Sequence, residues 1–112
     1  MNSNSDSLAS RVMAPGFAAL GDETRLRLVL RLSRFGPAST AQLCAGSALT
    51  RQAITKHLEV LAAASLVQGH RFGRERLWEL HPKRLAEAGE LLDRIASQWD
   101  SALGATPTSA ER

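Results

Sequence analysis

The sequence predicts a mainly α-helical domain with one small β-hairpin, for three reasons. Apolar residues recur every three or four positions in residues 22–34, 50–67 and 82–103, as they do on one face of an amphipathic helix. Residues 66–72 and 75–80 have the alternating pattern of two short strands joined at a glycine, Gly73. The chain has 112 residues, which is enough for one domain with a modest core.

Composition indicates a globular protein of a reducing compartment, which we expect to be the cytoplasm. Apolar residues make up 44% and charged residues 22% of the chain. No apolar run approaches the ~18 residues of a membrane span, and the polar start MNSNSDSLAS lacks a signal-peptide pattern, so no membrane partner is expected. The single cysteine, Cys44, excludes an internal disulfide framework. A formal charge of +3 mildly favours a polyanionic partner.

The two ends of the chain are predicted to be tails, with the domain occupying residues 8–103. Residues 1–7 are rich in Ser and Asn and are expected to be disordered, and residues 104–112 are expected to form a flexible tail. Apolar residues from Leu8 to Leu20 suggest a first helix. Pro15 should break or restart that helix, which leaves residues 15–20 as its predicted extent.

Asp22 is the predicted N-cap of the second helix, which should end before Gly36. The buried stripe of this helix is expected to contain Leu26, Val29 and Leu30, with Ser33. The helix also carries four arginines, which could contact phosphate but which we interpret as a solvated face: Arg25, Arg27, Arg31 and Arg34.

The next two helices have the pattern of a helix-turn-helix. Ser39 and Thr40 can open a short helix, residues 46–48 can form a turn, and Thr50 is a good N-cap for the longer helix after it. In that longer helix Ile54, Leu58 and Leu61 make the packing stripe. The opposite face is free to contact the DNA major groove through Arg51, Gln52, Thr55 and Lys56. Arg51 suits guanine and Gln52 suits adenine, while Lys56 suits either a base or a phosphate.

The hairpin that follows is predicted to be a wing, which makes the expected fold a winged helix-turn-helix. Three arginines gather at or beside its tip, where they can reach a phosphate or the minor groove: Arg71, Arg74 and Arg76. The alternative is a hairpin that its charges keep soluble. Trp78 and Leu80 alternate to one face and are expected to belong to the core.

The last helix, which Pro82 should begin, carries an apolar seam like that of a coiled coil. The seam consists of Leu85, Ala88, Leu92, Ile95, Trp99 and Ala102. We predict that Leu85, Leu92, Ile95 and Trp99 form a dimer interface, the alternative being that this helix only covers the core of its own chain.

Four stretches together resemble the ArsR-type family of bacterial transcriptional repressors. They are FAALGDETRLRLVLRL at 17–32, ALTRQAITKHLEVLAAASLV at 48–67, HRFGRERLWELHP at 70–82 and RIASQWDSAL at 94–103. The resemblance implies a homodimer whose first and last helices pack across the two-fold axis and whose recognition helices enter the major groove. The QWD sequence near the end of the last helix is similar to the metal-independent branch, whose members are often autoregulators encoded beside a small lipid- or hydrophobe-binding protein.

No metal site, cofactor or catalytic centre is predicted. Where the arsenic and cadmium sensors of this family carry a Cys-x-Cys pair, this chain has Cys44 and Gly46, and one thiolate cannot hold a soft metal alone. Residues 83–103 contain no histidine, whereas the zinc sensors use ligands in that helix. His57 should face the scaffold, and His70 and His81 flank the hairpin. No cluster of residues suggests catalysis, so an enzyme is not expected.

The sequence therefore predicts a repressor that binds double-stranded DNA as a homodimer, at an inverted repeat with half-sites about 10 bp or a multiple apart. Two alternatives stay open: a winged-helix module that binds another protein through the same apolar seam, and a metal-responsive repressor with ligands shared between subunits. The effector and any redox role of Cys44 are left open by the sequence.

Overall fold

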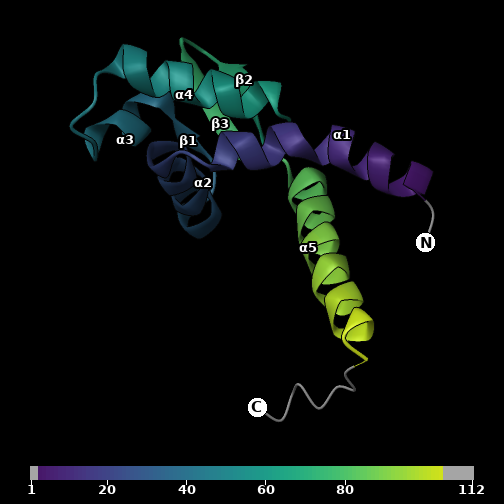
Figure 1. The fold of residues 1–112 in the computed structure, drawn as a ribbon. Coiled ribbons are helices and arrows are strands. Elements are labelled where there is room, and N and C mark those ends of the chain that lie inside the picture. The colour runs from purple at the N-terminus through teal and green to yellow at the C-terminus, as the bar shows by residue number, and fades with distance from the viewer. Residues whose placement is uncertain (1–2, 105–112) are drawn as a thin grey trace.

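The fold includes a long first helix that packs against three other helices. The computed structural model describes residues 3–104, with side chains from residue 6 onward. The elements in order are α1 (Ser3–Leu20), α2 (Glu23–Phe35), β1 (Ala38–Ser39), α3 (Thr40–Ala45), α4 (Arg51–Ala63), β2 (Val67–Phe72), β3 (Glu75–Leu80) and α5 (Pro82–Ala102). In Figure 1, α4 and the sheet lie on one side of α1, and α2 and α5 project from the other side.

The first helix corrects two predictions made from the sequence. It begins at Ser3, so residues 3–7 are helical rather than a disordered tail, and it continues through Pro15 without a break. A proline inside a helix removes one hydrogen bond and costs about 3 kcal/mol. Here Met13 and Ala19 are buried, and α1 packs against α2, α4 and α5. This tertiary packing compensates for the proline. Residues 1–2 of the predicted tail lie outside the described residues.

The second helix has its predicted bounds but buries a different face. Asp22 is the N-cap, as predicted, and its Oδ2 accepts a hydrogen bond of 3.0 Å from the backbone N–H of Arg25. Of the expected stripe only Val29 is buried, because Leu26 and Leu30 are 43% and 58% exposed. The stripe that enters the core instead contains Leu28, Val29 and Leu32. Both leucine pairs have i,i+4 spacing, so periodicity alone could not choose between them.

The core forms where α4 packs on the sheet and on α2. The sheet is antiparallel with strand order β1-β3-β2, and the hairpin matches the prediction except that β2 begins at Val67, one residue after the expected start. The largest fully buried side chains of the core are Trp78, Ile54, Leu58, Leu61 and Leu66. Burial of Trp78 and of the α4 stripe was expected from the sequence. β1 was not predicted, because two residues are too few for a periodic signal. It pairs with β3 through Ala38 opposite Trp78, which joins the wing to the start of α3.

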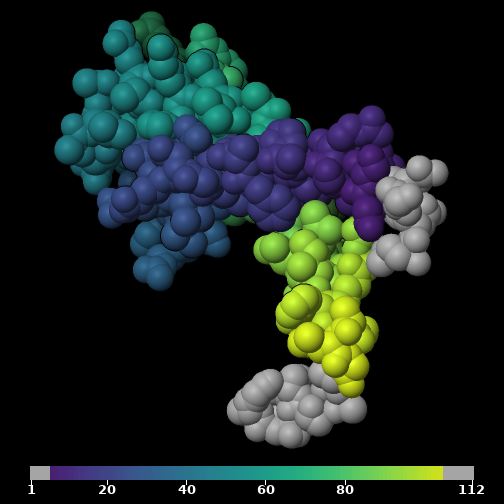
Figure 2. Space-filling model, in the orientation of Figure 1, coloured from purple at the N-terminus to yellow at the C-terminus, as the bar shows by residue number. Residues whose placement is uncertain are grey.

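The last helix begins at Pro82, as predicted, and leaves the body of the molecule. Among its described residues only Ala88 is buried, and Figure 2 shows the C-terminal half of α5 standing clear of the rest of the chain. Gly104, with a φ of 68°, takes a left-handed conformation one residue beyond the C-cap Leu103. Residues 105–112 of the predicted C-terminal tail lie outside the described residues. Within residues 3–104, no helix is long and apolar enough to cross a membrane.

Candidate nucleic-acid interface

The N-terminal end of α4 is fixed by a side-chain cap. The Thr50 hydroxyl accepts a hydrogen bond of 3.1 Å from the backbone N–H of Ala53, as predicted from the sequence. The turn before it is held in the same way, since Ser47 Oγ accepts a hydrogen bond of 3.0 Å from the N–H of Leu49. Cys44 Sγ donates to the carbonyl oxygen of Leu49 at 3.6 Å, and the cysteine packs beside the core. The turn therefore sets the direction in which the first residues of α4 point.

The first turns of α4 present unpaired polar side chains to solvent. Arg51, Gln52 and Lys56 are exposed, and within residues 3–104 none of them makes a side-chain hydrogen bond or ion pair. Thr55 lies between them in sequence and is partly buried. A guanidinium, an amide and an ammonium group supply the donors that base edges and phosphates accept, and the Gln52 amide also supplies an acceptor. This end of α4 can bind a polyanion without first breaking an internal contact.

The opposite side of α4 is seated on α2 by a polar cluster. Arg25 donates from Nη1 to His57 Nδ1 at 3.3 Å and from Nε to the carbonyl oxygen of Ala19 at 2.7 Å. Because a guanidinium has no acceptor, this contact needs a His57 ring whose Nδ1 is unprotonated. Asp22 Oδ2 lies 3.9 Å from the same Nδ1. The prediction that His57 faces the scaffold is confirmed.

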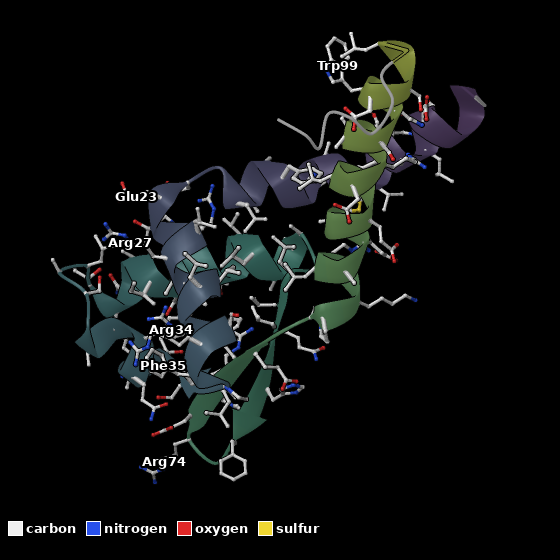
Figure 3. All side chains as sticks on the ribbon, turned by 90° about the horizontal axis from the view of Figure 1, so that it is seen from below. Glu23, Arg27, Arg34, Phe35, Arg74 and Trp99 are labelled. Atoms are coloured by element: carbon white, nitrogen blue, oxygen red, sulfur yellow. The ribbon has the colours of Figure 1, made fainter. Side chains whose placement is uncertain are left out.

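This cluster corrects the interpretation of one α2 arginine. Arg25 is partly buried and binds α1 and α4, so it does not belong to a solvated face. Arg27 does fit that interpretation, because it forms an exposed i,i+4 ion pair of 2.7 Å with Glu23, and Figure 3 shows the two side by side on α2. The pKa of the Asp22 carboxyl is lowered, chiefly by the hydrogen bond from the Arg25 backbone N–H. A charged Asp22 therefore caps α2 at the place where α1, α2 and α4 meet.

The wing ends in a tight turn that puts a cation at its tip. Phe72 is paired with Glu75, so the loop between the strands has two residues, Gly73 and Arg74. Gly73 has a φ of 65°, and Arg74 is not among the residues with positive φ. A glycine with positive φ at the first loop position is the pattern of a type II′ turn, which suits the twist of a hairpin. In Figure 3 the exposed Arg74 side chain extends from this turn into solvent.

The two other arginines of the wing differ from each other. Arg71 and Arg76 are cross-strand partners, so they lie on the same face of the hairpin. Arg71 is exposed and makes no ion pair within residues 3–104. The guanidinium carbon of Arg76 lies 4.3 Å from the centroid of the Trp78 ring, and its Nη1 lies 4.0 Å from Glu59 Oε2 of α4. Arg76 is therefore turned toward the body, although sequence alone grouped it with Arg74.

The outer face of the wing surrounds its carboxylate with hydrogen-bond donors. Glu79 Oε2 accepts hydrogen bonds of 2.7 Å from His70 Nε2 and 3.0 Å from Gln68 Nε2. The hydrogen bond from His70, followed by that from Gln68, lowers the pKa of Glu79. Two donors of the same face therefore stabilise the charged form of Glu79.

The predicted dimer residues of α5 fall into two groups. Leu85 packs against the core of its own chain, so it has less surface left for a partner than the sequence suggested. Leu92, Ile95 and Trp99 are 54%, 53% and 62% exposed. Leu8 and Val12 on α1 are exposed as well. In Figure 3 Trp99 lies at the opposite end of the molecule from Arg74, so this apolar surface is separate from the wing.

No metal-binding group is seen in the part of the chain that the structure describes. Within residues 3–104, no three His, Cys, Asp or Glu side chains gather closely enough to hold a metal ion. Asp22 and His57 lie beside the Arg25 cation, which would repel a metal.

A helix-turn-helix with a capped, unpaired recognition helix and a basic hairpin beside it defines a winged helix-turn-helix DNA-binding domain. The family described as "Helix-turn-helix domain" matches residues 20–70. The chain is 38% identical over 85 residues to the HTH-type transcriptional regulator Rv2034 of Mycobacterium tuberculosis, covering 76% of each protein. It is 32% identical over 77 residues to the arsenical resistance operon repressor of Escherichia coli, covering 69% of this chain and 66% of that protein.

The solved structures agree with these relatives. An ArsR-like transcriptional regulator from Rhodococcus sp. RHA1 superposes with a TM-score of 0.75 and 36% identity, over 89% of this chain and 93% of that one. The chain belongs to the ArsR family of DNA-binding transcriptional regulators. Its relatives are regulators rather than enzymes.

Proposed function

We propose that the chain is a sequence-specific repressor that binds an inverted-repeat operator as a homodimer. The observation that carries this proposal is the set of unpaired donors at the capped start of α4: Arg51, Gln52 and Lys56. With Thr55 they would contact the major groove, Arg51 at a guanine and Gln52 at an adenine. Arg74 and Arg71 would bind the flanking backbone or minor groove from the wing.

The homodimer is supported by the apolar surface of α5 and α1. Leu92, Ile95 and Trp99 are more than half exposed, and a water-exposed row of large apolar side chains is costly unless another surface covers it. A second copy offers the same row, which satisfies the self-complementarity of a two-fold interface. Two recognition helices related by a two-fold axis would read an inverted repeat with half-sites about 10 bp or a multiple apart.

Repression is supported by the relative in Escherichia coli, which is a repressor by name. A dimer bound at a promoter would block access to that DNA, and a location in the cytoplasm follows from such a target. We further propose that the chain regulates its own gene without a metal. The absence of a second thiolate next to Cys44, with Gly46 two positions on, supports the metal-independent part of this proposal.

The test is binding of the purified protein to its own upstream DNA and to an unrelated fragment of equal length, across a salt series. Each titration is done with zinc, with a chelator and with neither. We expect a preference for the upstream fragment that survives physiological salt and does not respond to metal. Equal binding that disappears with salt would leave only counterion release and would overturn sequence-specific recognition. A stoichiometric response to zinc would favour the metal-responsive alternative.

The same preparation separates the dimer from a protein-interaction module. Sedimentation in the absence of DNA should give a dimer at micromolar concentration. A monomer that binds duplex DNA weakly and without sequence preference would instead support a module whose apolar α5 surface binds a different protein.

A further inference from the structure

Arg76 makes two contacts, one with Trp78 of its own strand and one with Glu59 on the recognition helix. Its guanidinium carbon is 4.3 Å from the Trp78 ring centroid, a distance at which a cation is attracted to an aromatic face. Its Nη1 is 4.0 Å from Glu59 Oε2, and Glu59 lies on α4. Because Arg76 lies on β3 of the wing, its contact with Glu59 links the wing directly to α4.

The Trp78 ring is a rigid support for this link. Trp78 is fully buried, and its Nε1 donates a hydrogen bond of 2.9 Å to the Thr40 hydroxyl at the start of α3. A ring held at both its apolar face and its polar edge has little freedom to move. The Arg76 guanidinium therefore rests on a surface whose position is set by the core.

Gly69 leaves the space that the arrangement needs. It is the cross-strand partner of Trp78. A Cβ at position 69 would lie 2.9 Å from Arg76 Nε and 3.0 Å from the nearest atom of the Trp78 ring. Its φ is not in the left-handed region, so glycine is required here by space and not by backbone conformation. A side chain at this position would force Arg76 or the Trp78 ring to shift.

Electrostatics also turns Arg76 toward the body. Its cross-strand partner is Arg71, and like charges in directly opposed positions repel each other. Glu59 offers the Arg76 guanidinium a compensating charge on the side away from the wing tip. Of the two arginines, Arg71 is the one that makes no ion pair within residues 3–104.

We propose that Arg76 is a positioning residue that fixes the wing against α4, so that Arg74 and the first turns of α4 can engage DNA together. This inference rests on the DNA-binding function proposed above. It assigns Arg76 a role different from the phosphate contact expected from the sequence. In the same arrangement Glu59 holds the guanidinium and Gly69 leaves space for it.

The test compares Arg76→Met, Glu59→Gln and their double variant on the upstream duplex across a salt series. A positioning role predicts that each single variant weakens binding about three- to tenfold with the salt slope unchanged, and that the double variant is no weaker than either single one. The Glu59 variant best separates the two explanations. Removing a negative charge should strengthen DNA binding if only long-range electrostatics mattered, whereas the positioning role predicts weaker binding. Arg27→Met is the matched control, since it removes one exposed, paired arginine of α2 and should leave affinity nearly unchanged.

Gly69→Ala adds a variant that changes no charge. It should reproduce the loss seen with Arg76→Met, because its Cβ would crowd both Arg76 Nε and the Trp78 ring and so disturb their contact. If that variant fails to fold, the Arg76 and Glu59 variants still decide the question. Tighter binding by Glu59→Gln, together with a salt slope about 0.9 lower for Arg76→Met, would show that Arg76 contacts a phosphate and would overturn the inference.

Hydrogen exchange of the free protein separates this inference from the proposed function. The positioning role predicts faster exchange of the β2–β3 amides in both single variants, with no further increase in the double variant. If the unmodified protein binds no duplex, the proposed function fails, and this coupling still decides whether Arg76 and Glu59 hold the wing. Additive effects on exchange would overturn the link.

Discussion

His57 on α4 accepts a hydrogen bond of 3.3 Å from Arg25 on α2, and the same arginine donates to the Ala19 carbonyl at the end of α1. The Arg25 side chain, which belongs to α2, therefore joins α4, the helix proposed to read DNA, to α1, a helix of the proposed dimer surface. The contact joins positions 32 residues apart in the sequence. Its loss should affect both folding and the orientation of α4.

Replacing Arg25 with Met tests this contact. We expect a loss of about 1–2 kcal/mol in the free energy of unfolding, because two hydrogen bonds from a charged donor disappear from a partly buried place. Urea denaturation measures the change. Arg27→Met is the control, and its exposed pair with Glu23 should be worth no more than about 0.5 kcal/mol. Equal losses in the two variants would mean that Arg25 contributes no more than a surface arginine.

Arg51 and Arg74 should give different patterns of lost DNA binding. Arg51→Ala is expected to cost about 1–3 kcal/mol on the operator and to relax preference at one base pair, because it removes a base contact. Arg74→Ala should weaken binding to every sequence and lower the salt slope by about 1, because it removes a phosphate contact. Titrations on the operator and on single-base variants of it measure both effects. Equal and sequence-blind losses would count against the assignment of Arg51 to a base.

The fold was predictable where local chemistry decides it. Asp22 and Thr50 cap their helices through their own side chains, and Gly73 supplies the positive φ that the wing turn needs. These features depend on residues within three or four positions of one another, so the sequence displays them directly. The same holds for the α4 stripe, whose 3.6-residue period has no competitor in that helix.

The remainder depends on contacts that no local pattern encodes. Leu26 and Leu28 belong to two equally good stripes of α2, and only packing against α4 and the sheet selects the second. Continuation of α1 through Pro15 likewise depends on its neighbours α2, α4 and α5. At the candidate site, Arg76 was grouped with Arg74 because both are arginines near a turn. Its place over Trp78 follows from the hairpin register and from the space at Gly69.

Asp22 should make stability depend on pH at the acid end. Its pKa in the folded protein is lowered, chiefly by the hydrogen bond from the Arg25 N–H, so the unfolded chain binds its proton more readily. The stabilisation is therefore fully present above the unfolded pKa of about 3.9 and is lost as pH falls through the folded value. Asp22→Asn keeps a good cap but removes this titration.

Urea unfolding of the two proteins from pH 7 down to pH 3 measures the difference. Asp22 should be the more stabilising residue at neutral pH, and the advantage should shrink toward the acid end. Some acid dependence should persist in the Asn variant, because the pKa of Glu79 is also lowered by its hydrogen bonds from His70 and Gln68. A difference between the two proteins that stays constant over the whole range would show that the charge of Asp22 has no part in the cap.

Trp99→Asp should convert the proposed dimer to a monomer. Trp99 is 62% exposed on a part of α5 that stands clear of the body, so the change removes little from the core of its own chain. In a dimer it would bury a charge inside an apolar interface, which is strongly unfavourable without a partner. Sedimentation should show the monomer, and operator binding should fall because only one half-site is contacted. The matched control is Leu30→Asp, which places the same charge on an equally exposed apolar position of α2, 58% exposed, away from the α5 stripe. A dimer that survives Trp99→Asp but is lost with Leu30→Asp would move the interface from α5 to α2.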